Sequence, residues 1–282
     1  MCRLSPFVIT LPDADRAELE RRARCYTLPH AVVVRAKIVL LAAEGLENTQ
    51  IAARLDVLDV YEVPEGPERE LLLTLARQSR ERGWWQQYGE AVPEWFATYV
   101  GLEAEAAHIA RYQAEYVPGL LQTQEYATAV HAAALMNAGQ AEIASQVAVR
   151  MERQARLSED GAPQLWVVLN EAVIRRLVGD RATMHEQLVK LAGASGNPNI
   201  TLQVLPFGAG AHPAMDSAFS MLTFDPPTAG AVVYLEHPTG ALYLEKQDEV
   251  ARYRLIFDHL RAMALSPSES QRLLSRTADD LA

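Results

Sequence analysis

Residues 231–245, AVVYLEHPTGALYLE, contain two short runs of β-branched and aromatic residues joined by a Pro-Thr-Gly turn. Such runs are typical of β-strands, and a tight turn between them predicts a hairpin of antiparallel strands. Glu236, His237 and Thr239 lie at this turn, but the pattern alone assigns them no function. The stretch therefore predicts a sheet in the second half of the chain.

Further strand and helix patterns surround this hairpin. The strand candidates are LWVVL (165–169), NITLQVLPF (199–207) and SAFSMLTF (217–224), and the helical patterns are ATMHEQLVKLAG (182–193), DEVARYRLIFDHLRAMAL (248–265) and a last helix opened by the capping box Ser266–Glu269. The fold class that we predict is α+β, with a helical N-terminal half followed by a small, mainly antiparallel sheet packed with helices.

The first half is dominated by helical periodicity. GLEAEAAHIARYQAEY predicts a helix from Leu102 to Tyr116, and AEIASQVAVRMERQARL predicts another before the composition changes at SEDGAP (158–163). We expect three parts, which are a truncated helix-turn-helix-like helical unit at 1–57, a helical part of the main domain at 58–160 and an α+β part of that domain at 161–282.

Residues 35–57, RAKIVLLAAEGLENTQIAARLDV, predict the first two helices of a helix-turn-helix, with Asn48 as the cap of the second; a short charged helix over Leu11–Arg24 precedes them. A DNA reader then needs a third, recognition helix. Instead, LDVYEVPEGPERE (58–70) supplies two prolines and several acids, which interrupt a helix and repel phosphates. The sequence therefore argues against specific DNA binding.

The composition and net charge of the chain disfavour some classes of function. With 282 residues and 49% apolar composition, the chain can bury a substantial core. Its formal charge is −10; residues 1–57 carry eight basic and seven acidic side chains, which leaves 18 against 29 in residues 58–282. The acidic balance of residues 58–282 disfavours broad contact with nucleic acid or anionic membranes. Two cysteines, no apolar leader at the start and no apolar stretch near the roughly 18 residues of a membrane span predict a cytoplasmic protein.

Glu105 lies beside the apolar face of the helix expected over Leu102–Tyr116, so we expect its carboxylate to point inwards. It would form a structural ion pair with Arg150 or Arg153, which share a face of the later helix. The alternative is a general acid or ligand anchor with a raised pKa.

The densest group of aromatic residues comprises Trp84, Trp85, Tyr88, Trp95, Phe96 and Tyr99. We expect core packing, with a pocket lining as the alternative. If a pocket exists, we expect it where the helical half meets the sheet half. Its walls would be Trp84, Trp85 and Tyr112, and the loop of residues 208–216 would approach it.

That loop, GAGAHPAMD, contains His212 and Asp216, which are candidates for acid/base chemistry, although local hydrogen bonding is the simpler interpretation. A phosphate cradle is disfavoured because a strand pattern, not a helix, follows the glycines. The seven histidines lack metal-ligand spacing, and nucleotide-binding loops are missing. We therefore expect no metal and no cofactor.

From about Tyr61 onwards the chain resembles the actinobacterial WhiJ-like regulators. The matching phrases include RERGWWQQYGE, WFATYVGLEAEA, EYVPGLLQTQEYA, LWVVLNEAVIRR, NITLQVLPFGAGAHPAMD and VVYLEHPTGALYLEK. The resemblance implies a helix-turn-helix followed by a C-terminal domain with a regulatory or partner-binding role. Residues 1–57 resemble instead the opening of a transposase-type helix-turn-helix, so the join falls where a recognition helix belongs.

Three functions remain open, and one of them, recognition of duplex DNA by the N-terminal unit, ranks below the first of the other two because of the acidic, proline-containing segment 58–70. In the first, the protein resembles a transcription regulator whose C-terminal domain binds a small-molecule effector or a small protein partner. In the second, the same domain is a cofactor-independent enzyme acting on a small organic, natural-product-like substrate. The proposed ligand-binding residues are Trp84, Trp85, Glu105, Tyr112, Arg150, Arg153 and His212, and the candidates for catalysis are Glu105, His212 and Asp216.

Overall fold

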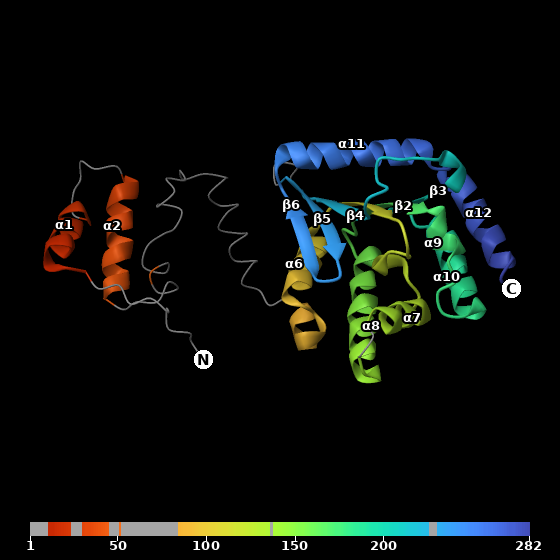
Figure 1. Ribbon diagram of the computed structural model, residues 1–282, viewed down its shortest axis with the longest axis horizontal. Helices are drawn as coiled ribbons and strands as arrows, with labels where there is room; N and C mark the ends of the chain where they lie inside the picture. Colours follow the sequence, from red (N-terminus) through yellow and green to blue (C-terminus); the bar gives the residue numbers. More distant parts are fainter. Residues whose placement is uncertain (1–10, 24–29, 45–50, 52–83, 136–137, 226–229) are drawn as a thin grey trace. The chain divides into compact units, whose positions relative to one another are not determined.

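The computed structural model (Figure 1) describes residues 11–23, 30–44, 51, 84–135, 138–225 and 230–282. The chain divides into two compact units, Met1–Arg82 and Gly83–Ala282. The expected boundary between residues 57 and 58 and the acidic segment 58–70 lie outside the described residues. So does the expected second helix of the helix-turn-helix, apart from Ile51, which is buried.

Two helices are described in the first unit, α1 (Asp13–Ala23) and α2 (His30–Ala43). α1 carries acids in its first turn and arginines in its last, a charge order that complements the helix dipole. It confirms the helix expected over Leu11–Arg24. α2 begins before Arg35, where the sequence pattern placed the start of the first helix-turn-helix element.

The second unit is built on one six-stranded sheet. Its strands are β1 (His108–Gln113), β2 (Gln164–Asn170), β3 (Ile200–Leu205), β4 (Phe219–Thr223), β5 (Ala231–His237) and β6 (Gly240–Leu244), in the spatial order β3-β2-β1-β4-β5-β6. The pairs on either side of β2 are parallel, and the other three pairs are antiparallel. The protein is thus α+β with a mainly antiparallel sheet, as predicted.

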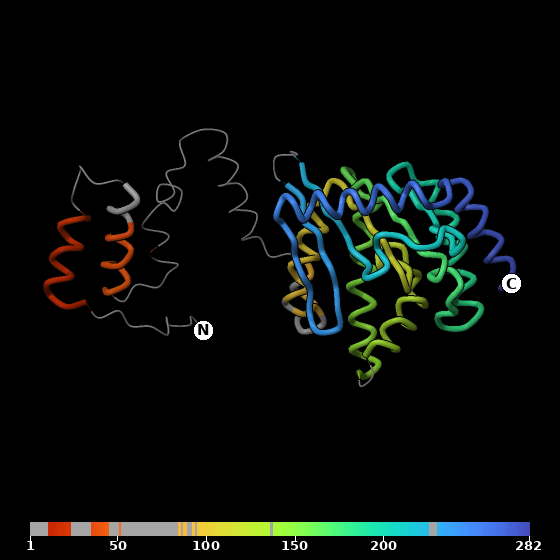
Figure 2. Tube along the Cα trace, turned by 45° about the horizontal axis from the view of Figure 1, so that its top comes forward, coloured from red at the N-terminus to blue at the C-terminus, as the bar shows by residue number. Residues whose placement is uncertain are grey.

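Helices cover both faces of this sheet. They are η1 (Trp84–Ala91), α6 (Glu94–Glu105), η2 (Gly119–Leu121), α7 (Gln124–Ala134), α8 (Gln140–Ala155), η3 (Arg156–Ser158), α9 (Glu171–Arg175), α10 (Arg181–Ala194), η4 (Phe207–Ala209), α11 (Gln247–Met263) and α12 (Pro267–Asp279). In Figures 1 and 2, α11 runs along one face, and α6, α7 and α8 lie on the other.

Two hydrophobic cores result from this arrangement. Val167 and Leu169 of β2 belong to the core under α6, α7, α10 and α12, whereas Val168 belongs to the core under α11. Successive strand residues point to opposite faces, so a central strand needs apolar residues throughout. This explains the continuous run LWVVL.

The expected helix from Leu102 to Tyr116 is wrong in its second half. α6 ends at Glu105, Ala106 is extended, and β1 begins at His108. β1 is hydrogen-bonded to β2 on one side and to β4 on the other. These distant partners satisfy the backbone of the segment and override the helix propensity of its alanines. The helical part and the α+β part therefore share one sheet.

The capping box expected at Ser266 and Glu269 is confirmed, with each side chain hydrogen-bonded to the other residue's backbone N–H. Among the described residues, no helix is both long enough and apolar enough to cross a bilayer.

Candidate ligand-binding site

A row of polar side chains crosses the face of the sheet that α6 covers. Arg111 on β1 pairs in register with Ser220 on β4, and Ser220 pairs with Tyr234 on β5, so these three side chains share one face. Gln113 and Glu236 lie two residues further along β1 and β5 and share that face too. The polar row therefore extends to the end of the sheet where β1 and β5 finish.

A cavity of about 270 Å³ lies at this end of the sheet. Its lining includes Arg111, Gln113, Tyr116, Asp216, Phe219, Tyr234 and Glu236. The chain leaves β1 to form β2 and β3 on one side and returns to β4 on the other side. Crevices at the carboxyl end of a strand where the connection changes direction are common ligand sites in open sheets.

Arg111 forms the buried floor of this cavity and is only 7% exposed. Its Nη1 donates to the hydroxyl of Tyr99 at 3.2 Å. With the Gln113 amide oxygen turned towards the guanidinium, Nε and Nη2 each donate to it at 2.8 Å. Two of the five N–H bonds are thus left over, and no carboxylate in the described part of the chain lies at ion-pairing distance.

Arg111 nevertheless stays charged. Burial opposes the charge, but Tyr99, Tyr116 and Glu103 outweigh it and hold the pKa of the guanidinium above its ordinary value. The cavity therefore offers a fixed positive charge and free donors at its floor.

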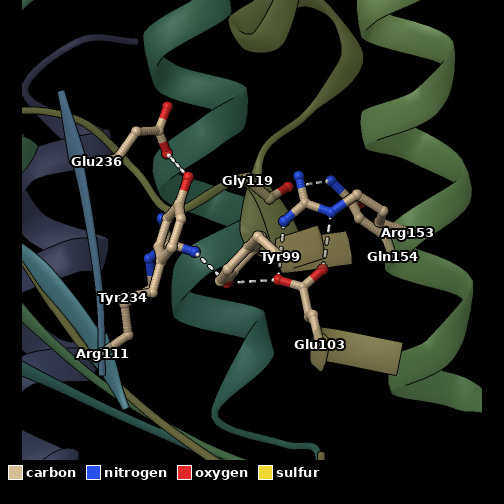
Figure 3. A network of polar contacts seen from close by, with 8 residues as sticks. All are labelled: Tyr99, Glu103, Arg111, Gly119, Arg153, Gln154, Tyr234 and Glu236. Atoms are coloured by element: carbon tan, nitrogen blue, oxygen red, sulfur yellow. Dashed lines mark hydrogen bonds and ion pairs between the residues drawn. The ribbon is translucent and has the colours of Figure 1, made fainter. Parts of the chain in front are cut away.

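A buried polar network continues from Arg111 into the helical layer (Figure 3). The Tyr99 hydroxyl donates to Glu103 at 2.7 Å, and Arg153 donates two hydrogen bonds to the same carboxylate at 2.7 and 2.8 Å. Both partners of this ion pair have side chains that are about 5% exposed. Burial would raise the pKa of Glu103, but Arg153 and Tyr99 outweigh it and lower the pKa. Glu103 therefore stays ionised in the interior.

The interior carboxylate is thus Glu103 and not Glu105, which is exposed. The expected ion pair of Glu105 with Arg150 or Arg153 is wrong, because α6 ends at Glu105 and the apolar positions after it belong to β1. Glu103 follows Tyr99 by four residues and shares its helix face. Of the two arginines expected to pair with an interior acid, Arg153 does so, whereas Arg150 donates to Gln122.

Two more polar side chains act on this network: Arg150 adds a positive charge, and His131 adds a neutral imidazole ring. Arg150 donates to Gln122 at 2.7 Å; burial, followed by repulsion from Arg153, lowers its pKa to about 10. Burial and then these two arginines lower the pKa of His131 to about 4. Its Nε2 is buried without a hydrogen-bond partner among the described residues. Among the described residues, two arginines are buried, Arg111 and Arg153, against one buried carboxylate, Glu103.

The aromatic residues are divided between core and surface cavity. Trp84 contacts Trp85 edge-on at 5.9 Å between ring centroids and lines a second cavity of about 440 Å³, together with Glu103 and Arg153. Trp85 lies against Gly101, where a Cβ atom would stand 3.3 Å from the indole. The structure thus places Trp84 beside a different cavity from Asp216, and does not bring the residues of the expected single pocket together.

His212 and Tyr112 contact each other on the α11 side of the sheet. The Nδ1 atom of His212 accepts from the backbone N–H of Ala214 at 3.3 Å, so Nε2 carries the proton towards the Tyr112 hydroxyl, also at 3.3 Å. This is the local hydrogen bonding expected as the simpler interpretation. Asp216, four residues later, is exposed at the mouth of the cavity above Arg111.

Sequence reasoning missed the two central residues of the site, Arg111 and Glu103. The available signal was IARYQ, in which a charged residue stands between β-forming apolar and aromatic residues. On strand β1, Arg111 shares a face with the buried Ile109, whereas on the expected helix it would be a solvated position. Glu236 of the predicted hairpin lies at the cavity.

Comparison with known proteins places these residues in a family. Residues 96–276 match a family described as a domain of unknown function, DUF5753. No curated protein and no solved structure matches the chain. The match covers more than half of the chain, including Arg111, Asp216 and Glu236. The chain therefore belongs to the DUF5753 family.

Proposed function

We propose that the protein is a regulator-type protein whose C-terminal domain binds a small-molecule effector in the cavity above Arg111. The observation that carries this proposal is the buried guanidinium, which has two free N–H bonds and no carboxylate partner among the described residues. An unpaired charge in a protein interior costs several kcal/mol of desolvation. A ligand that supplies the missing acceptors would recover part of that cost.

The regulatory part of the proposal rests on the resemblance to WhiJ-like proteins and on charge. The acidic balance of residues 58–282, 18 basic against 29 acidic side chains, favours a ligand or partner other than nucleic acid. The acidic, proline-containing segment 58–70 occupies the place of a recognition helix, so we propose that DNA binding is weakened or lost. Two cysteines in the whole chain are consistent with a cytoplasmic protein.

Native mass spectrometry of the freshly purified full chain tests this function, because it detects a retained molecule whatever its chemical class. We expect an adduct of a small molecule on the wild-type chain, and no adduct on Ala218→Trp, which fills the mouth of the cavity. The control is Ala141→Trp, the same substitution at an exposed position of α8 that lines neither cavity.

The outcomes separate the competing functions. A co-purifying peptide would favour a small protein partner. Conversion of the retained molecule into a product of different mass would favour the enzyme. If Ala218→Trp and Ala141→Trp retain the molecule equally, it does not bind in this cavity and the proposal is wrong.

A further inference from the structure

The cavity above Arg111 has charges of opposite sign at its two ends. Arg111 is buried at the floor, whereas Asp216 and Glu236 are exposed at the mouth. Within the described residues, neither of these two carboxylates has a lysine, arginine or histidine at ion-pairing distance. A third acid of the lining, Glu115, differs because it is paired with Arg176. The cavity thus has an arginine without an ion pair at its floor and two carboxylates without an ion pair at its mouth.

The positive floor is reinforced from the helical layer. Charges of both signs act on the phenol of Tyr116. Burial and Glu236 raise its pKa, whereas Arg111, Arg150 and Arg153 lower it. All four charged groups therefore act on one side chain that lines the cavity. Of these three arginines, Arg153 is ion-paired with Glu103, whereas the side-chain partners of Arg111 and Arg150 among the described residues are neutral, so the floor remains positive.

The negative mouth is held in place by the sheet. The hydroxyl of Tyr234 donates to the Glu236 carboxylate at 3.2 Å (Figure 3). Burial and this carboxylate raise the pKa of Tyr234, so the phenol remains a donor and Glu236 remains the acceptor. Because Tyr234 lies in the same row as Arg111, one strand register fixes the positions of both charged groups.

We propose that the ligand is a small zwitterion with the dimensions of an amino acid. This inference rests on the proposed function and specifies the ligand of the same cavity. The carboxylate or other oxyanion of the ligand accepts from the free N–H bonds of Arg111, as guanidinium groups commonly bind such anions. The ammonium group lies between Asp216 and Glu236. Tyr116, Met215 and Ala218 supply apolar lining for the remainder of the molecule.

Size supports this ligand class. The volume of about 270 Å³ lies below the range of roughly 300–1,000 Å³ that drug-sized ligands occupy. A molecule that fills it therefore has only a short carbon skeleton between its two charged groups.

The test compares three forms of one compound on the full chain. A thermal-shift screen of the proteinogenic amino acids at millimolar concentration selects the one that stabilises the protein most. Calorimetric titration then compares this amino acid with its N-acetyl derivative, which lacks the cation, and with its methyl ester, which lacks the anion. We expect the zwitterion to bind about tenfold or more tightly than either derivative, since each loses one charge-assisted contact.

Variants assign each charge of the ligand to its end of the cavity. In Asp216→Asn and Glu236→Gln, the preference for the free amine over the N-acetyl form should fall. In Arg111→Gln, the preference for the free carboxylate over the ester should fall. The control is Asp225→Asn, which changes an exposed acid beyond the far end of β4 and should preserve both preferences. Asp216 and Glu236 are exposed, so their variants remain informative if Arg111→Gln fails to fold.

Two results would overturn the inference, and they differ from a failure of the proposed function. If singly charged derivatives bind as tightly as the zwitterion, the ligand needs only one charge. If no amino acid binds but another compound does, and Ala218→Trp blocks it, the cavity is a ligand site of another class. If the cavity retains no compound of any kind, both the inference and the proposed function are wrong.

Discussion

The ion pair between Glu103 and Arg153 lies in the interior, so removing one partner leaves the other charge uncompensated. We expect Glu103→Gln to lower the free energy of unfolding by about 3 kcal/mol. Glu105→Gln makes the same substitution two residues later at an exposed position and should change it by less than about 0.5 kcal/mol. Urea denaturation measures both values. Equal effects would mean that the pair contributes no more than a surface charge.

His131 should make stability depend on pH in a defined window. Its pKa is about 4 in the folded protein because of burial and the two nearby arginines, against an ordinary value of 6.5. Between these values the unfolded chain binds the proton and the folded chain does not, so stability falls as the pH falls through this window. Below about pH 4 the loss is complete.

The variant His131→Leu removes this titration. Between about pH 7 and pH 5, the wild type should lose about 1–2 kcal/mol more unfolding free energy than the variant. Urea denaturation at both pH values gives the comparison. The same loss in both proteins would show that His131 titrates normally and that the arginine cluster does not act on it.

Residue-level prediction from the sequence succeeded only where the boundaries of the elements were right. An interior acid was expected to pair with Arg150 or Arg153, and one of these two, Arg153, does so, because α8 was correctly assigned. The acid was wrong by two positions, since the face of a helix was extended past its true end at Glu105. Arg111 was missed for the same reason.

At the level of elements, the five strands after residue 160 were predicted, and β1 was not. β-Branched and aromatic runs identify the later strands locally. β1 has alanines and glutamates on both sides, and it becomes a strand only through pairing with β2 and β4, which lie far away in the sequence. Tertiary pairing of this kind leaves only a short local signal, the IARYQ pattern at residues 109–113, and the site depends on it because β1 carries Arg111.

The start of α12 offers a test at this level. Ser266 caps the helix and forms a reciprocal pair with Glu269, so Ser266→Ala should lower the free energy of unfolding by about 1 kcal/mol. Ser275→Ala makes the same change at an exposed position inside the helix and should leave stability unchanged or slightly higher. Thermal unfolding compares them. An equal loss in both would contradict the role of the cap.

For the whole molecule, the charge distribution predicts weak contact with DNA. Residues 1–57 have eight basic side chains against seven acids, and the rest of the chain is acidic. We expect the full chain to bind duplex DNA weakly and with strong salt dependence, as measured by fluorescence anisotropy. Recovery of one defined genomic sequence at nanomolar protein in about 150 mM salt would contradict this expectation.

The central claim is that a small molecule binds in the cavity with an anionic group on Arg111. A crystal structure of the full chain with the compound that it retains tests this claim most directly. The predicted result is electron density in the cavity with an oxyanion at hydrogen-bond distance, about 2.8 Å, from the guanidinium of Arg111. An empty cavity above Arg111, with the compound bound beside Trp84 or elsewhere, would contradict it.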